Sequence, residues 1–331
     1  MACDNSRKLP LIDLSGLEGP ERGRIGKQIL EACETWGFFQ CINHGVDKST
    51  QNAVREACLE FFKLSLEEKR KWTTSLATFE GYSNPKHKEN TGKLAKTQEG
   101  VQFLFNLRDP NPVVNEDHER LYPSNPPTYK PAVRAYFKES IALEKKLLAV
   151  LSEALGLEAD ALMKGLEGGA GEAKFAFRSS LYIPESRTED ELAGIGLPPH
   201  TDTPSMLTLL FSDDVPGLEI EKDNEWVKVD HVPDSYIVNV GDPLEVLTNG
   251  RLKSVEHRAY AHTTKERFSC IVITIAQEEA KLGPLPQLID AARPALYETR
   301  TMAEFMARLT TVGYGGKSTI NFAKRTAVPV A

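Results

Sequence analysis

The residues best suited to chemistry stand in the stretch GLPPHTDTPSMLTLL, residues 196–210. His200 and Asp202 are separated by one residue and follow a Pro-Pro bend. In an extended chain residues i and i+2 point to the same side, so this imidazole and this carboxylate can converge on one point. Such a pair suits two ligands of a metal ion, an ion pair or a hydrogen-bonded core pair. A metal site requires a third ligand.

Candidates for that third ligand follow later in the chain. His257, in NGRLKSVEHRAY, lies more than fifty residues after Asp202, whereas His231 (VDHVPDS) and His262 (AHTTKER) stand in turn-like stretches where we expect surface positions. Two histidines and one carboxylate on one face of an octahedron leave three positions open, which suits a non-haem Fe(II) that binds a co-substrate and O2. A structural zinc site would have no open position.

A possible anion-binding pair comes ten residues after His257. Arg267 and Ser269 alternate in RFSCIVITI and share one face of an expected strand. If that face points into a barrel, a buried arginine is costly unless it meets an anion. A planar guanidinium and a hydroxyl fit a carboxylate well. The alternative is an ion pair between Arg267 and an acidic side chain of the protein.

The elements that must position these residues differ between the two halves of the chain. Apolar residues at three- and four-residue spacing predict helices over 22–36, 49–63 and 131–155, and Ser65 with Glu68 forms a capping signature for a short helix between them. A further helix is expected at MAEFMARL. Residues 82–98 are polar and lack a period, which predicts a loop.

Short runs of β-branched and aromatic residues occupy positions from about 174 to 280. They are FAFRSSLYI, MLTLLF, GLEIE, WVKV, SYIVNV and FSCIVITI, and turn-forming residues separate them. PLIDLS and VQFLFNL are expected to add edge strands. Many short strands at regular spacing predict a barrel or a sandwich.

The composition excludes several classes of partner. The chain has 331 residues and a net charge of -7, with 40 basic residues scattered among 47 acidic ones, so neither nucleic acid nor an anionic membrane surface is expected as a partner. No spanning helix or secretory signal is expected. Five cysteines without a C-x-x-C pattern suit a reducing compartment. We expect a cytoplasmic monomer that acts on a small molecule.

The order H-x-D, then H, then R-x-S resembles the plant-type 2-oxoglutarate- and Fe(II)-dependent dioxygenases, which include flavonoid and plant-hormone oxidases. The likeness extends over nearly the whole chain, through LPLIDLSG, TWGFFQCINHGV, FFKLSLEEKRKW, VPGLEI, WVKV, VNVGDPLEVLTNGRLKSVEHRA and GPLPQLID. It implies an α+β fold with a mainly β core, a double-stranded β-helix (jelly roll) flanked by N-terminal and C-terminal helices. It also implies three regions: 1–170 (helical with edge strands), 171–280 (the jelly-roll core) and 281–331 (a helical extension).

The resemblance also implies the ligands and the reaction. Fe(II) would be held by His200, Asp202 and His257, and the co-substrate 2-oxoglutarate by Arg267, Ser269 and Tyr182, the last in SSLYIP. The family hydroxylates or desaturates small metabolites with O2, and ascorbate is the expected reductant.

The expected substrate comes from the likeness of the tail GPLPQLIDAARPALYETRTMAEFM to flavonoid oxidases, which favours a flavonoid such as a flavanone. Candidate residues for the pocket wall, which core packing would explain equally well, are Phe103, Phe105, Ile273, Phe305 and Met306. The main alternative is oxidation of a plant hormone or other small carboxylate, which calls for a second positive group that the sequence does not identify. The same pattern of residues is also compatible with an ascorbate-using relative, a zinc isomerase or a metal-binding jelly roll without catalysis.

Three departures from the family pattern stand near the site. Many members have a glycine two residues after H-T-D, whereas this chain has Thr203-Pro204-Ser205 and a run to Leu207 that is one residue longer. Ser180 and Leu181 replace the asparagine and tyrosine that often precede the family tyrosine. Ile273 stands where an aromatic residue commonly lines the pocket. The family pattern therefore does not predict the geometry of the loop beside the metal. The other two departures weaken the assignment of the family's substrates to this chain.

Overall fold

The computed structural model describes residues 8–73, 81–83, 98–106, 122–167, 173–184, 194–313 and 316–325. The N-terminal part contains β1 (Leu11–Asp13), α1 (Arg22–Thr35), β2 (Phe38–Ile42), α2 (Lys48–Lys63), α3 (Leu66–Arg70), β3 (Gly81–Ser83), β4 (Gln98–Asn106), α5 (Tyr129–Ala154) and α6 (Ala161–Lys164). The helices expected from periodicity are confirmed. The loop expected over 82–98 is shorter at both ends, because β3 and β4 include its first and last residues, and residues 84–97 lie outside the described ranges.

Glycine ends α1 for a steric reason. Gly37 has φ +66, and a Cβ atom there would lie 2.2 Å from the carbonyl oxygen of Lys253. Only glycine adopts this left-handed conformation without cost and admits so close a backbone.

The central part consists mainly of strands. It contains β5 (Lys174–Tyr182), β6 (Ile195–His200), β7 (Ser205–Ser212), β8 (Leu218–Lys222), β9 (Glu225–Lys228), β10 (Tyr236–Val240), α7 (Asp242–Leu247), β11 (His257–Tyr260) and β12 (Arg267–Ile275). The C-terminal part has β13 (Lys281–Leu282), the 3-10 helix η3 (Pro286–Leu288), β14 (Arg300–Thr301), α8 (Met302–Val312) and α9 (Ser318–Asn321).

Most strands form two sheets that face each other. The major sheet has the order β1-β2-β10-β7-β12-β5-β4-β3 and the minor sheet the order β6-β11-β8-β9. Apolar residues from both sheets meet between them, in a cluster of Phe38, Leu218, Ile220, Val229 and Ile237. This is the jelly roll that the sequence predicted.

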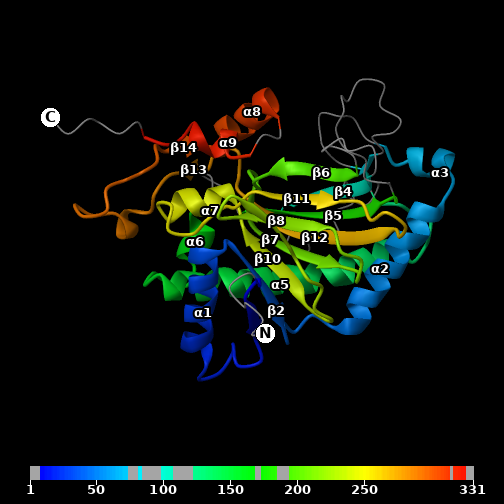
Figure 1. The fold of residues 1–331 in the computed structure, drawn as a ribbon, viewed down its shortest axis with the longest axis horizontal. Helices are drawn as coiled ribbons and strands as arrows, with labels where there is room; N and C mark the ends of the chain where they lie inside the picture. The colour runs from blue at the N-terminus through cyan, green and yellow to red at the C-terminus, as the bar shows by residue number, and fades with distance from the viewer. Residues whose placement is uncertain are drawn as a thin grey trace.

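Helices cover the other face of the major sheet. Figure 1 shows α5 and α2 on the side of the major sheet opposite to β6 and β11 of the minor sheet. Tyr136 of α5 lies edge-on to Phe177 of β5, with 6.0 Å between ring centroids. The major sheet is therefore buried on both faces, by helices on one side and by the minor sheet on the other.

The sheets also correct the expected element boundaries. β4 is not an edge strand, because β3 pairs with its outer side. The strands β2, β6 and β11 and the helix α7 were not expected. The division at residues 170 and 280 remains a prediction, and the major sheet crosses it, since β1 to β4 lie in one sheet with β5, β7, β10 and β12. Within the described ranges, no helix is both long and apolar enough to span a bilayer.

Candidate metal centre and active site

The two histidines of the candidate metal site are direct neighbours across two strands. His200 ends β6 and His257 begins β11, and the two residues pair in the antiparallel minor sheet. Their ring centroids lie 4.2 Å apart, and both side chains are buried. The Pro-Pro bend is part of β6, which is the edge strand of its sheet, where prolines are tolerated because one side of the strand needs no hydrogen bonds.

Asp202 lies where the chain crosses from one sheet to the other. β6 of the minor sheet ends at His200, and β7 of the major sheet begins at Ser205. Asp202 Oδ1 lies 3.5 Å from Nε2 of His200 and 3.6 Å from Nε2 of His257. The three ligand atoms all lie within 4.8 Å of one another. Two imidazoles and a carboxylate thus face one point, as the sequence predicted.

Backbone carbonyls orient both imidazoles. His200 Nδ1 lies 2.8 Å from the carbonyl oxygen of Pro198, and His257 Nδ1 lies 3.1 Å from that of Val255. A carbonyl only accepts, so each Nδ1 carries the proton and each Nε2 presents a lone pair to the common point. Burial, together with the nearby His200, lowers the pKa of His257 to about 4, so this ring is neutral at physiological pH.

The carboxylate of Asp202 is charged and has one oxygen available. Burial favours the protonated form, but His257 and His200 together with a hydrogen bond from Thr208 outweigh it and keep the pKa of Asp202 well below its ordinary value. Oδ2 accepts hydrogen bonds from Thr208 Oγ1 at 2.6 Å and from Asn239 Nδ2 at 2.8 Å. Two neutral imidazoles, one anionic oxygen and satisfied outer atoms fit a divalent metal ion.

Asp242, which the sequence reasoning missed, holds the loop that carries Asp202. Its Oδ2 accepts hydrogen bonds from Thr201 Oγ1 at 3.2 Å and Thr203 Oγ1 at 2.9 Å, and its backbone N–H donates to the carbonyl of Asp202 at 3.0 Å. The preceding Gly241 has no room for a side chain, since a Cβ atom would lie 1.8 Å from the carbonyl oxygen of Ser205. The only sequence signal was the segment VGD within the family-like stretch.

Arg267 is buried beside Tyr182, between the two sheets. Its side chain is 2 % exposed, its Nε donates to the carbonyl of Val215 at 3.2 Å, and its guanidinium lies 5.1 Å from the centre of the Tyr182 ring. A Cβ atom on Gly217 would lie 2.9 Å from Arg267 Cδ, so this glycine leaves space for the arginine. Among the described residues, no carboxylate lies within 4.0 Å of its nitrogens. Asp213 interacts electrostatically with Arg267, but the two side chains form no contact ion pair.

The strand register brings the other proposed 2-oxoglutarate residues alongside. Arg267 is opposite Tyr182, and Ser269 is opposite Ser180 on β5 and Ser212 on β7. Directly opposite residues in antiparallel strands share a face. Arg267, Ser269 and Tyr182 therefore line one patch on the interior face of the major sheet.

The residues proposed for the wall of the substrate pocket lie in different parts of the structure. Ile273 lies on the same face as Ser269 and is partly exposed. Phe305 is fully buried edge-on against Phe322, at a centroid distance of 5.1 Å, and Met306 packs partly buried on the same core. Phe103 and Phe105 belong to β4, but their side chains lie outside the part of the chain that the structure describes.

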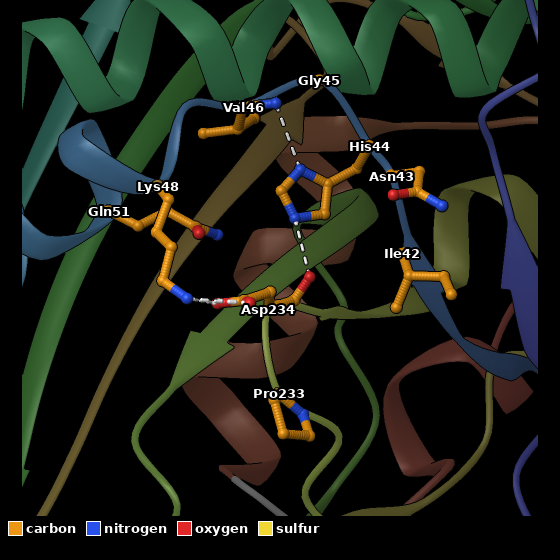
Figure 2. A pocket seen from close by; sticks show the side chains of 9 residues that line it. All are labelled: Ile42, Asn43, His44, Gly45, Val46, Lys48, Gln51, Pro233 and Asp234. Carbon is orange, nitrogen blue, oxygen red and sulfur yellow. Dashed lines mark hydrogen bonds and ion pairs between the residues drawn. The ribbon is translucent and has the colours of Figure 1, made fainter.

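The competing histidines stand away from the three ligands. His231 is exposed, and His262 Nδ1 accepts hydrogen bonds from the backbone N–H groups of Thr264 and Lys265, which caps a surface turn. A separate pocket, shown in Figure 2, includes none of the three candidate ligands in its lining, which consists of residues 42–46, Lys48, Gln51 and residues 233–234. In this pocket His44 contacts the carbonyl of Asp234. His44 thus has a structural role.

The C-terminal segment returns to the metal site, which the sequence did not predict. Gly316 forms a parallel bridge with His200, and the N–H of Lys317 donates to Glu256 Oε1 at 3.2 Å, next to His257. The ammonium group of Lys317 lies 3.1 Å from Oε2 of the buried Glu245. The segment is therefore fixed beside both histidines.

Comparisons with known proteins agree with this geometry. Residues 9–127 match the family described as non-haem dioxygenase in morphine synthesis N-terminal, and residues 175–274 match the 2OG-Fe(II) oxygenase superfamily. Jasmonate-induced oxygenase 4 of Arabidopsis thaliana is 34% identical over 318 residues, covering 96% of this chain and 86% of that protein. Flavonol synthase 1 of Crocosmia x crocosmiiflora is 35% identical over 298 residues, covering 90% of this chain and 85% of that protein.

A solved structure shows the same fold with its ligands. The crystal structure of JOX2 in complex with 2OG, Fe and JA superposes with a TM-score of 0.80 at 32% identity, and the match covers 96% of this chain and 90% of that one. The chain therefore belongs to the plant-type 2-oxoglutarate- and Fe(II)-dependent oxygenases, with Fe(II) and 2-oxoglutarate as its cofactor and co-substrate.

Proposed function

We propose that this enzyme oxidises a small, mainly apolar organic acid whose carboxylate is bound by Arg178. Fe(II) is held by His200, Asp202 and His257. The far carboxylate of 2-oxoglutarate is bound by the patch of Arg267, Ser269 and Tyr182. The observation that carries the choice of substrate is the position of Arg178 on the interior face of β5.

The residues of the site have separate tasks in this reaction. When bound, the iron supplies the oxidative chemistry that couples decarboxylation of 2-oxoglutarate to oxidation of the substrate. Three protein ligands leave three of six positions open for the co-substrate and O2. The hydrogen bonds that the ligands make with Pro198, Val255, Thr208 and Asn239 keep them oriented without substrate.

The anchor for 2-oxoglutarate follows from a buried guanidinium that no described carboxylate contacts within 4.0 Å, although Asp213 interacts with it electrostatically. Burying the guanidinium of Arg267 beside a tyrosine ring, without a described carboxylate in contact, is costly for an enzyme that binds no anion there. A carboxylate of the co-substrate would accept hydrogen bonds from the guanidinium and from the hydroxyl of Ser269. This assignment explains why both polar residues point into the jelly roll.

Arg178 supplies the second positive group that a carboxylate substrate requires. It lies four residues before Tyr182 on β5, so the two share a face. It is partly exposed and directly opposite Ile271 of β12. A Cβ atom on Gly100 would lie 3.6 Å from Arg178 Nε, so the arginine passes over a residue without a side chain.

Aliphatic residues surround Arg178 on this interior face. Ile271 is opposite Leu210 of β7, Ile273 follows two residues later, and all three are partly exposed. An apolar wall with one strongly polar group is the usual form of a small-molecule pocket. The wall suits an aliphatic or compact acid at least as well as a flat aromatic molecule.

A flavonoid such as a flavanone is the second candidate substrate. The similarity to Flavonol synthase 1 supports it. The jasmonate-induced oxygenase and the JOX2 complex support the acid to the same degree. In the flavonoid case, Arg178 would face a phenolic hydroxyl rather than a carboxylate.

The test measures succinate formed from 2-oxoglutarate above the rate without substrate, with naringenin, a gibberellin, an indole acid and a jasmonate supplied separately. We expect coupled turnover with at least one acid and little with naringenin. Arg178→Gln should raise the KM for that acid by about tenfold to a hundredfold, as expected for the loss of a charge-assisted contact. The matched control is Lys174→Gln, at the far end of the same strand face, which should leave this KM unchanged.

If naringenin is the one substrate that supports coupled turnover, the substrate is a flavonoid and the proposal of an acid is wrong. A lack of 2-oxoglutarate turnover with every substrate, together with a lack of Fe(II) binding, would refute the assignment of the site itself.

A further inference from the structure

Strand β7 contains a β-bulge next to the metal site. Against β12, Ile273 pairs with Thr208, but Ile275 pairs with Ser205, so three steps on β7 match two on β12. The pairing of β7 with β10 is regular over residues 207–210, with Asn239 opposite Thr208 and Val240 opposite Leu207.

The bulge changes the face of β7 on which Ser205 lies, whereas Thr208 keeps the regular alternation with Leu210 and Ser212. Met206 and Leu207 are consecutive, yet both are fully buried in the same large core. Strict alternation would place them on opposite faces. Since both belong to that core, Ser205 and Thr208 on either side of them come together, with their hydroxyl oxygens 3.0 Å apart. A bulge beside an active site commonly redirects a side chain in this way.

The hydroxyl of Thr208 reaches the metal ligand Asp202. Its Oγ1 lies 2.6 Å from Asp202 Oδ2. An ionised carboxylate has no proton to donate, so the single proton of Thr208 is given to Asp202. Asn239 Nδ2 donates to the same oxygen at 2.8 Å, while Oδ1 is the oxygen nearest to both histidine Nε2 atoms.

We propose that Thr208, which keeps the regular register of β7 beside the bulge, is a positioning residue that makes Asp202 a ligand through one oxygen only. The proposal depends on the assignment of the metal ligands in the proposed function. With both donors in place, Oδ2 has its hydrogen-bonding capacity committed away from the metal. Without Thr208, Oδ2 keeps only the hydrogen bond from Asn239, so the carboxylate is held less firmly in the orientation that presents Oδ1 to the metal.

The experiment compares metal binding in the wild type, Thr208→Val, Thr208→Ser and Thr208→Cys. Mn(II) is titrated calorimetrically into the metal-free protein, first alone and then with 2-oxoglutarate present. Thr208→Val keeps the shape and loses the donor, so we expect weaker Mn(II) binding by about tenfold or more, the usual range for loss of an outer hydrogen bond to a ligand. Thr208→Ser keeps the hydroxyl, so its affinity for Mn(II) should be close to that of the wild type. Thr208→Cys has a poorer donor, so its affinity should lie between those of the wild type and Thr208→Val.

Thr274→Val is the matched control, because Thr274 is a buried threonine of the adjacent strand β12 whose hydroxyl donates to Glu144 instead. It should bind Mn(II) like the wild type. Wild-type affinity in Thr208→Val would overturn the proposal, as would equal losses in Thr208→Ser and Thr208→Val. If Thr208→Val fails to fold by circular dichroism, wild-type affinity in Thr208→Cys overturns it. Failure of the wild type itself to bind Mn(II) would count against the ligand assignment, not against Thr208.

Discussion

Single residues of the site present charged groups that no described side chain of opposite charge contacts directly. Arg267 is the clearest example, because its guanidinium is buried against Tyr182 and the carbonyl of Val215, and neither contact supplies a negative charge. From sequence, an ion pair with an acidic side chain was an equal explanation. The described part of the chain contains no such pair within 4.0 Å, which favours the co-substrate as the missing anion.

Arg267→Lys tests this assignment at the residue scale. Lysine keeps the positive charge but loses the planar pair of donors, so the apparent affinity for 2-oxoglutarate should fall by about tenfold to a hundredfold, or roughly 1.5 to 3 kcal/mol. Metal binding should change little. The control is Arg258→Lys on β11, whose guanidinium stacks 3.9 Å from the Trp226 ring on a different face. An unaltered 2-oxoglutarate dependence in Arg267→Lys would remove this residue from the site.

At the scale of the elements, helix α5 and the major sheet are joined by a buried polar contact outside the catalytic site. The long helix α5 contacts β12 through Glu144, a fully buried carboxyl group that accepts a hydrogen bond from Thr274 Oγ1. Its other oxygen, Oε2, has no partner among the described residues. Burial raises the pKa of Glu144 well above its ordinary value, despite the hydrogen bonds from Thr274. The folded protein therefore keeps a proton at this helix–sheet contact that the unfolded chain releases.

Because of this contact, the free energy of unfolding should fall as the pH rises. Above the unfolded pKa of about 4.3 the unfolded chain binds fewer protons than the folded protein, so the free energy of unfolding falls by up to about 1.4 kcal/mol per pH unit until the folded pKa is reached. Glu144→Gln removes the titration and should lose less stability than wild type between about pH 5 and 8. Urea unfolding across this range measures the difference. The exposed control Glu158→Gln should follow wild type; a wild-type slope in Glu144→Gln would contradict the prediction.

At the scale of the whole molecule, the C-terminal segment returns to the candidate metal site, where Gly316 forms a bridge with His200. Gly316 has φ +59 and lies so close to Glu256 that a Cβ atom would be 2.2 Å from its carboxylate. Lys317 is tied to Glu245, which also accepts hydrogen bonds from Tyr297 OH at 2.7 Å and from the N–H of Ser254 at 2.7 Å. Gly316 and Lys317 are thus fixed beside Glu256, which precedes β11, and to Glu245 of α7.

Lys317→Met should destabilise the protein, because it leaves the carboxylate of Glu245 buried without its cation. We expect a loss of about 1 to 3 kcal/mol in urea unfolding, since the lysine is partly solvated. The double variant Lys317→Met/Glu245→Gln removes the unpaired charge and should recover part of that loss. Lys324→Met, on the exposed surface after α9, serves as the control. Equal destabilisation in the single and double variants would show that the ion pair is not the cause.

Local patterns in the sequence were enough for part of this protein. The helices predicted over 22–36, 49–63 and 131–155 are observed as α1, α2 and α5, because a helix buries one face whatever it packs against. The sequence also indicated His200, Asp202 and His257 as candidate ligands and the R-x-S pair as a candidate anion site, because metal and carboxylate binding demand particular side chains. Reaction class and co-substrate followed from those residue types and from the family resemblance.

Tertiary structure alone decided the rest. The pairing of His200 with His257, the position of Arg178 opposite Ile271 and the bulge beside Thr208 all depend on strand register. A shift of register by one residue reverses the face of every side chain in a strand, and sequence periodicity does not contain the register between distant strands. The return of Gly316 to His200 likewise depends on contacts more than a hundred residues apart, so no local pattern could predict it.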